Sequence, residues 1–173
     1  MTSKKFTSRP ITLTREIRAA AFRHAELAFH NVDLSGPSFE GRVFFNNPAA
    51  DGKTPQVLEN GYAGKFTIFG AGRCWGDEGH CMVPQARRAF DTRSPHQLMP
   101  RSVTLVVTQA LLKAAREGSR LTVTVVPVVL ASRGAAGARD CFHFDGMALR
   151  LRSSHGLLED PMMKNVSAAS LQG

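Results

Sequence analysis

YAGKFTIFGAGRCWGDEGHCMVP, the stretch from Tyr62 to Pro84, decides how the rest of the chain is interpreted. Its first part predicts a half-buried strand, because residues 62, 64, 66 and 68 share one face and residues 63, 65 and 67 share the other. Glycines follow at positions 70, 72, 76 and 79, which is typical of a loop whose backbone needs conformational freedom. The stretch therefore predicts a strand that leads into a glycine-rich loop.

The same alternation of apolar and polar residues predicts further strands on both sides of this stretch. They are expected at about residues 25–32, at Phe39–Phe45, at Ser102–Thr108, from Leu121 to Leu130 and from Met147 to Arg152. Gln109–Arg116 predicts a short helix with Gly118 as its stop. The segment from Ile11 to Ala28 is ambiguous, since it has helical propensity while its second half also alternates. About seven short strands and one short helix predict a mainly all-β fold, an antiparallel β-sandwich or barrel.

The length of 173 residues is that of one domain with a real core. The predicted organisation is an N-terminal tail or extension over residues 1–24, a β-sandwich domain over 25–152 and a C-terminal tail over 153–173. Residues 1–11 are interpreted as a loose tail because they show little periodicity. The residues from Ser153 onward are expected to pack on a partner or to stay mobile.

The chain carries a formal charge of +8, from 22 Lys and Arg against 14 Asp and Glu. A positive field suits acidic partners or nucleic acid, but no run of five like charges and no aromatic ladder accompanies it. Solvated basic surface is therefore favoured over an acidic protein partner, and nucleic acid is favoured least. No apolar run approaches the ~20 residues of a membrane span, and the basic N-terminus lacks the apolar core of a secretory signal. A cytoplasmic location is expected. Export of the chain together with a secreted partner stays open as an alternative.

The glycine-rich loop concentrates side chains that bind metals. Cys74, His80 and Cys81 predict a metal site, because thiolates and an imidazole suit Cu(I) or Zn(II). Its further ligands are expected among His96, Cys141 and His143. Two alternatives stay open: a local Cys74–Cys81 disulfide, and thiols and an imidazole that serve structure only. Nucleophilic catalysis by either cysteine with His80 is favoured least, since nothing in the sequence specifies its geometry.

Two aromatic residues near this loop predict a contact with a partner protein. Trp75 lies off the alternating pattern of the strand, and Phe69 directly follows the strand. Aromatic side chains serve well at interfaces, where a protruding ring can plug a partner's active site. The alternative for Trp75 is a lid on the edge of the sandwich. Phe66 shares the buried face of the strand and is expected in the core.

Five segments of the chain form a pattern of strands and spacings that is shared with a known family. They are RVFFNNPAAD (42–51), YAGKFTIFGAGR (62–73), GHC (79–81), VTLVVTQALLKA (103–114) and LTVTVVPV (121–128), within about residues 25–130. This pattern resembles the C-terminal domain of tyrosinases and polyphenol oxidases, which follows a dicopper catalytic domain. The resemblance implies a β-sandwich that packs over the entrance of the copper site and keeps the enzyme latent. It also implies a side chain inserted as a placeholder for substrate and, in some members, help with copper loading.

The histidines depart from what a dicopper centre requires. A type 3 copper centre needs six histidines on a helical bundle, three per copper and several at i, i+4 spacing. The six histidines of this chain are His24, His30, His80, His96, His143 and His155, and no two are four residues apart. The sequence therefore predicts no catalytic residues for phenol oxidation by this chain alone.

The leading hypothesis is a non-catalytic accessory protein that associates with a separate dicopper phenol oxidase, covering its site or assisting copper loading. The alternative is a stand-alone metal- or ligand-binding β-sandwich that uses the Cys74–Cys81 loop and holds copper or zinc. An enzyme of an unrecognised type is the third hypothesis.

Overall fold

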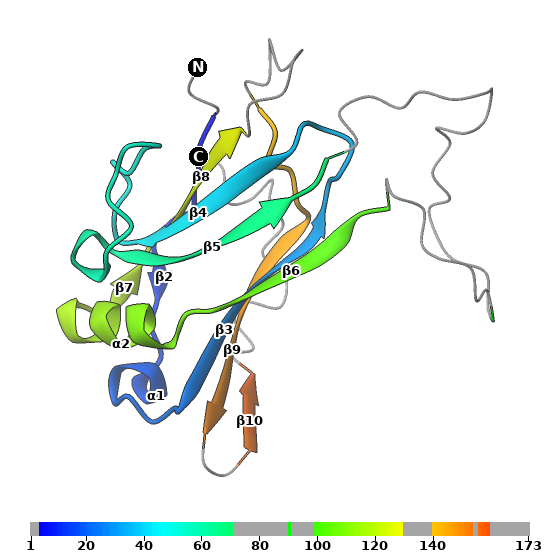
Figure 1. Ribbon diagram of the computed structural model, residues 1–173. Helices are drawn as coiled ribbons and strands as arrows, with labels where there is room; N and C mark the ends of the chain where they lie inside the picture. The colour runs from blue at the N-terminus through cyan, green and yellow to red at the C-terminus, as the bar shows by residue number, and fades with distance from the viewer. Residues whose placement is uncertain (1–3, 71–89, 91–98, 130–139, 154–155, 160–173) are drawn as a thin grey trace, which may run out of the picture.

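The computed structural model of the protein describes residues 4–70, 90, 99–129, 140–153 and 156–159. Within them, two four-stranded sheets, one two-stranded sheet and two helices are formed, and every strand pair is antiparallel (Figure 1). The first large sheet has the order β1 (Phe6–Thr7), β8 (Val123–Val129), β4 (Phe39–Phe45), β5 (Tyr62–Ile68). The second has the order β10 (Gly156–Glu159), β9 (Gly146–Ser153), β3 (His24–Val32), β6 (Arg101–Val106). The remaining elements are β2 (Ile11–Thr12) paired with β7 (Arg120–Leu121), α1 (Arg15–Arg18), α2 (Thr108–Glu117) and the short 3-10 helix η1 (Leu58–Asn60).

The two large sheets enclose one main hydrophobic core, so the predicted antiparallel β-sandwich is confirmed. In the second sheet, Leu27 of β3 is paired with Leu105 of β6 on one side and Leu149 of β9 on the other. In the first sheet, Val43 of β4 and Val125 of β8 are paired and fully buried. Because successive side chains of a strand point to opposite faces, one face of each sheet supplies this core.

Six phenylalanine rings join the two sheets inside the core: Phe6, Phe29, Phe39, Phe66, Phe142 and Phe144. The ring of Phe29, in the second sheet, lies 5.6 Å from that of Phe66 in the first, centroid to centroid. It also lies 5.4 Å from Phe142 and 5.3 Å from Phe144, both edge-to-face. Edge-to-face rings add a favourable interaction beyond the burial of their area. The segment before β9 is thereby fastened between the sheets.

The outer face of the first sheet is covered by the connection between β4 and β5. A second, smaller cluster lies under this connection, with Phe44, Ala50 and Val126 buried and Tyr62 and Val128 packed against them. Since Val123 and Val125 face the main core while Thr124 and Val126 are buried on the other side, β8 is buried on both faces. A doubly buried strand needs apolar residues at nearly every position, which explains the continuous valine-rich run of β8.

A β-bulge changes the predicted faces of β5. Val43 pairs with Gly64, whereas the next residue, Phe44, pairs with Tyr62, so Ala63 is an extra residue in this strand. The bulge turns Tyr62 outward, where its ring lies 5.6 Å from that of Phe44, and turns Ala63 into the main core. The prediction that Tyr62 shares a face with Phe66 is therefore wrong, because an inserted residue shifts the two-residue period by one.

Most predicted elements lie where the alternation placed them. The strand at Phe39–Phe45 has its predicted bounds, the strand near residues 25–32 begins at His24, and the helix is one residue longer at each end. The ambiguous segment contains both structures, with α1 before β3, so there are two helices rather than one. Seven strands have four or more residues, and β1, β2 and β7 have two each.

Both predicted tails contain ordered structure, which corrects the sequence interpretation. Phe6 of β1 is 6% exposed and pairs with Val125, so residues 4–11 are no loose tail. Ile17 of α1, at 1% exposed, also belongs to the main core. At the other terminus, β10 adds a strand to the edge of β9. The short strands escaped prediction because two residues cannot show a period.

Candidate functional site

The predicted metal ligands lie partly within the described residues. Cys141 is buried, at 4% exposed, beside the phenylalanine rings. His143 is exposed, and its Nε2 atom lies 3.8 Å from Oδ1 of Asp140. Cys74, His80, Cys81 and His96, together with Trp75, lie outside the described residues. Among the residues that the structure describes, no three His, Cys, Asp or Glu side chains are grouped as metal ligands, so the metal site stays a prediction.

One end of the sandwich, here called the loop end, collects the strand termini that the predicted site would use. β5 ends and β6 begins there, since Ile68 pairs with Phe39 while Arg101 pairs with Val32. β8 ends and β9 begins at the same end, because Val129 also pairs with Phe39. Residues 71–98 and 130–139 therefore both join strands at the loop end, and Cys141 and His143 precede β9 there. The described ends of both connections thus lie at one end of the fold, together with Cys141 and His143.

Phe69 lies at the loop end, directly after β5, and is 80% exposed. The next residue is held in place, because the Gly70 N–H donates a hydrogen bond to Oγ of Ser38 at 3.1 Å. A Cβ atom on Gly70 would lie 2.1 Å from the carbonyl oxygen of Gly36, so this position admits only glycine. The backbone that carries Phe69 is therefore packed closely while its ring faces solvent. The partner contact predicted for Phe69 and Trp75 is untested, and Phe69 has the exposure that such a contact needs.

Polar side chains at the loop end hold the connections between strands. The Asp33 carboxylate accepts hydrogen bonds from the backbone N–H and the hydroxyl of Ser35, both at 2.8 Å. Nδ2 of Asn31 donates to Oδ2 of Asp145 at 2.8 Å, from a backbone with a φ of 53°. The Asp33 N–H also donates to the carbonyl oxygen of His143 at 2.9 Å. These carboxylates therefore act as turn and loop acceptors.

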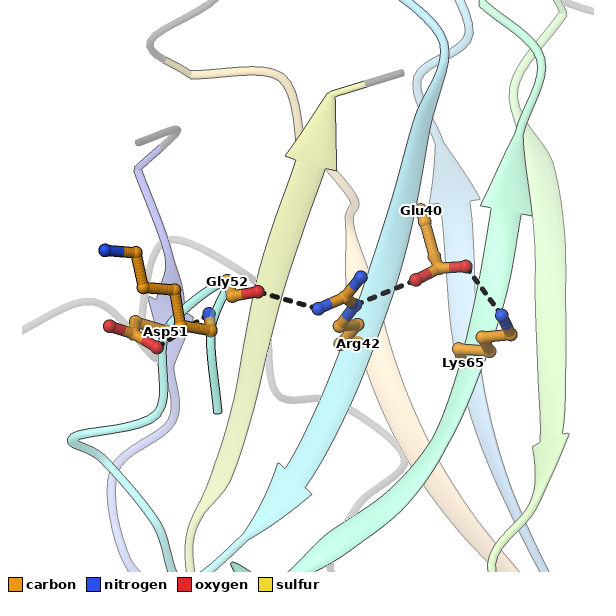
Figure 2. Close-up of polar contacts among 6 residues, drawn as sticks. Glu40, Arg42, Asp51, Gly52 and Lys65 are labelled. Atoms are coloured by element: carbon orange, nitrogen blue, oxygen red, sulfur yellow. Dashed lines mark hydrogen bonds and ion pairs between the residues drawn. The ribbon is translucent and has the colours of Figure 1, made fainter. Parts of the chain in front are cut away.

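The RVFFNNPAAD segment begins with an ion-pair network on the outer face of the first sheet. Figure 2 shows Nε of Arg42 donating to Oε1 of Glu40 at 2.8 Å and Nη1 of Arg42 donating to the carbonyl oxygen of Gly52 at 2.7 Å. Nζ of Lys65, on the neighbouring strand β5, donates to the other Glu40 oxygen at 2.7 Å. Arg42 thereby holds the segment between β4 and β5 against the outer face of the first sheet.

The asparagines of this segment hold the ends of the same connection. Asn46 exchanges two hydrogen bonds with the backbone of Thr122, because its N–H donates to the Thr122 carbonyl and its Oδ1 accepts from the Thr122 N–H, both at 2.9 Å. Nδ2 of Asn47 donates to the carbonyl oxygen of Asn60 at 2.8 Å. Asp51 Oδ1 closes the turn by accepting from the backbone N–H groups of residues 53 and 54. The polar residues of RVFFNNPAAD thus fix the connection from β4 to β5, and they make a structural motif.

Replacement of Asn46 should measure the contribution of this motif to stability. Asn46 has a φ of 53°, a left-handed conformation in which Asn and Asp are tolerated better than Ala. Asn46→Ala leaves the Thr122 N–H without its acceptor as well, so we expect the free energy of unfolding to fall by about 1–2 kcal/mol. Asn46→Asp keeps an acceptor for the Thr122 N–H and a side chain that tolerates the left-handed conformation. In urea titrations of both variants, its loss of unfolding free energy should be less than half that of Asn46→Ala. Equal losses in the two variants would contradict the assigned role of Oδ1.

Ionised neighbours control the Glu40 carboxylate. The hydrogen bond from Lys65, followed by that from Arg42, holds the pKa of Glu40 below its ordinary value of 4.5, and burial opposes them. A carboxylate whose pKa is lower in the folded chain stabilises the fold above its unfolded pKa. This stabilisation is lost as the pH falls through the folded-state pKa.

The pH dependence of a Glu40→Gln variant should therefore have a defined sign. At pH 7 we expect the variant to be less stable than the parent protein, because the carboxylate pairs with Lys65 and Arg42. Below pH 4.5 the difference in unfolding free energy should shrink as Glu40 becomes protonated in the parent. Chemical unfolding at pH 7 and at a pH below 4.5 measures this difference in unfolding free energy. Glu59→Gln is the charge-matched control, because Glu59 is exposed. A difference that is independent of pH would exclude the ion-pair origin of the effect.

Comparisons with known proteins found similarity to solved structures of polyphenol oxidases. No family model and no curated protein matches the chain. Among solved structures, it is similar to a recombinantly expressed latent aurone synthase, a polyphenol oxidase, with 18% identity and a TM-score of 0.46 over 92% of this chain. It is also similar to latent aurone synthase from a natural source, with 19% identity and a TM-score of 0.45 over 88% of this chain.

The similarity is confined to part of those enzymes. The chain spans 25% of the length of each of these two polyphenol oxidase chains. Neither helix in the described part of this chain has the length and apolar character that crossing a membrane requires. The protein is thus an antiparallel β-sandwich that is similar to a quarter of a polyphenol oxidase chain.

Proposed function

We propose that this protein is a non-catalytic accessory protein of the kind found as the C-terminal domain of tyrosinases and polyphenol oxidases, and that it binds a separate dicopper phenol oxidase. One observation supports the proposal above the others. Four of the five segments that resemble that domain follow one another as structural elements of the sandwich: the end of β4 with its connection, then β5, then β6 with α2, then β7 with β8. The fifth, GHC at 79–81, lies outside the described residues. In these four segments the described residues of the resemblance build the fold, as Arg42 and Asn46 do.

The placement of the two histidines of β3 suits a partner that supplies the copper chemistry. His24 and His30 are six positions apart on β3, which is about 20 Å along a strand, too far to share one metal ion. Nε2 of His24 lies 2.9 Å from Oε1 of Glu26, and Nδ1 of His30 lies 3.3 Å from Oγ of Ser102. Both rings are thus engaged within the second sheet. The oxidation of phenols is therefore assigned in this proposal to the partner.

The loop end is the surface proposed to cover the partner's site. Phe69 presents an apolar ring there that is 80% exposed, on a backbone packed closely at Gly70. A rigidly carried aromatic side chain loses little conformational entropy when it enters a pocket. The chain would accordingly reduce the activity of the oxidase by occlusion, without taking part in the reaction.

Inhibition of a dicopper phenol oxidase tests the proposal directly. The catalytic domain of such an oxidase, prepared without its own C-terminal domain, is titrated with this protein while diphenol oxidation is measured. We expect saturable inhibition and co-elution of the two proteins, and we expect Phe69→Ser to weaken inhibition by about tenfold or more. Val106→Ser is the matched control, because Val106 is also apolar and exposed, at 62%, but lies at the far end of β6.

The outcomes separate this function from the alternatives. If the protein neither co-elutes with the oxidase nor changes its rate, the accessory role is wrong. Equal effects of Phe69→Ser and Val106→Ser on inhibition would show that the oxidase does not contact the loop end through Phe69. Copper and zinc content per chain is measured in the same preparations, with Cys81→Ser as the variant. A stoichiometric metal that this variant loses, in a chain that ignores the oxidase, would support the stand-alone metal-binding alternative.

A further inference from the structure

Six exposed arginines lie on or beside α1, α2, the start of β3 and the end of β9. Figure 1 shows these elements at the end of the sandwich opposite the loop end, here called the arginine end. The six arginines are Arg15, Arg18, Arg23, Arg116, Arg120 and Arg152. Within the described residues, none of the six side chains forms an ion pair with a carboxylate. The five lysines of the described residues behave differently, since Lys4, Lys65 and Lys113 are paired with carboxylates. The unpaired positive charge of this end is therefore carried by guanidinium groups.

Long-range backbone contacts bring these arginines together from distant parts of the sequence. The Leu13 N–H donates to the carbonyl oxygen of Ser119 at 2.8 Å, and Arg120 pairs with Thr12. These contacts place the start of α1 beside the end of α2, which carries Arg116 in its last turn. The Arg23 N–H donates to the carbonyl oxygen of Arg152 at 2.9 Å, which joins the chain after α1 to the end of β9. α1 links both junctions, so the backbones of the six residues lie at one end of the fold.

The carboxylates beside these arginines are already used. Glu117 of α2 is paired with Lys113 of the same helix, and Glu26 of β3 is paired with His24. The Glu16 carboxylate is hydrogen-bonded at the start of α1 to its own backbone and to Thr14, and these bonds lower its pKa. The charge of Arg15 also contributes to the lower pKa of Glu16, so these three carboxylates offset part of the positive field. Six arginines against three carboxylates still leave the arginine end positively charged. Like charges held on one surface repel each other until a counter-charge binds or salt screens them.

Three described carboxylates also lie at the other end of the fold, where fewer described arginines accompany them. Asp33, Asp140 and Asp145 all lie at the loop end, on the segments around β3 and before β9. Lys4 is paired with Asp140 there, and Arg101 begins β6 at the same end, so the excess of positive charge among the described residues lies at the arginine end. A local excess of one sign of charge attracts and orients a partner of the opposite sign before contact is made.

We propose that the arginine end binds an acidic surface of another protein. Arginine presents five donors in a planar fork that matches a carboxylate bidentately, which lysine does not. Nucleic acid also attracts arginine, but non-specific strands are held by aromatic platforms on which bases stack. The exposed aromatic residues of the described chain are Phe69, at the loop end, and Phe90, in the connection that joins strands there. This inference concerns a surface opposite Phe69 and does not depend on the oxidase being the partner.

Two double variants that change the net charge equally test this inference. Arg23→Gln/Arg116→Gln removes one charge from each junction of the arginine end. Lys53→Gln/Arg101→Gln removes two exposed charges that lie elsewhere, in the connection after β4 and at the loop end. The probe is a short fluorescein-labelled peptide of alternating Asp and Glu, titrated by anisotropy at near-physiological salt. A single-stranded DNA of the same charge is titrated in parallel, and circular dichroism confirms that both variants are folded.

The expected result is a loss of peptide affinity of about tenfold or more in the first variant and less than about twofold in the second, with the DNA bound more weakly than the peptide. Equal losses in the two variants would overturn the inference, because net charge alone would then explain binding. DNA bound more tightly than the peptide, and lost in the same variant, would identify a nucleic-acid surface instead. A parent protein that does not bind the peptide would also overturn it.

Discussion

Phe29→Ala is expected to lower the free energy of unfolding by about 3–5 kcal/mol, the cost of emptying a large aromatic site in a closed core. Phe29 is fully buried on β3, and its ring contacts Phe66 of the opposite sheet and Phe142 and Phe144 of the segment before β9. The truncation therefore loosens both sheets and the connection between them at once. Urea unfolding followed by far-UV circular dichroism measures the change, with the midpoint compared at a constant slope.

The matched control is Phe69→Ala, the same truncation at a ring that is 80% exposed. An exposed side chain without core contacts should change the free energy of unfolding by less than about 0.5 kcal/mol. Similar losses in the two variants would mean that Phe29 is not enclosed between two sheets, and the sandwich would be wrong. Phe69→Ala remains informative about function, since this ring is proposed to contact the oxidase.

The strands of the core could be predicted because burial on one face leaves a period of two in the sequence. Met147, Leu149 and Leu151 of β9 are all buried, and they alternate as the sequence indicated. β4 has its predicted bounds for the same reason. The sequence of a strand of this length shows which face is buried. Such a strand can therefore be predicted without knowing which strands lie beside it.

Short strands depend on neighbours that are far away in the sequence. The hydroxyl oxygen of Ser8 accepts a hydrogen bond from the N–H of Val123, 115 positions away, and this contact fixes the end of β1. No local pattern encodes such a pairing, so residues 4–11 were interpreted as a tail. The bulge at Ala63 escaped prediction similarly, since its signal is a register shift against β4. Tertiary pairing decided both cases.

The RVFFNNPAAD connection and the arginine end differ in how far the sequence alone reveals them. RVFFNNPAAD was recognisable because Asn46 and Arg42 make contacts within one compact connection and its neighbouring strands. The arginine end could not be recognised, because Arg23 and Arg116 are distant in sequence and looked scattered. Only the pairing of β2 with β7 and of β3 with β9 collects them. The ligands expected at Cys74, His80 and Cys81 stay a prediction, outside the described residues.

Gly61→Ala is expected to cost about 3 kcal/mol or more of unfolding free energy, from backbone strain and a collision together. Gly61 follows η1 with a φ of 78° and a ψ of 11°, the left-handed conformation that a Cβ atom disfavours by about 1–2 kcal/mol. A Cβ atom at this position would lie 2.1 Å from the carbonyl oxygen of Phe45. The strands cannot separate to relieve this contact without breaking the 2.7 Å hydrogen bond from the Phe45 N–H to the Gly61 carbonyl.

Gly118→Ala separates this explanation from the general effect of replacing a glycine. Gly118 ends α2 with an extended backbone, a φ of 179°, and an added Cβ atom would meet no atom within 4 Å. Its replacement also reduces the conformational freedom of the unfolded chain, so we expect a change of less than about 1 kcal/mol, in either direction. If Gly61→Ala were as mild as Gly118→Ala in the same urea titration, the tight join between β4 and β5 would be wrong. The structural role assigned to the RVFFNNPAAD connection, which ends at this glycine, would then lose its support.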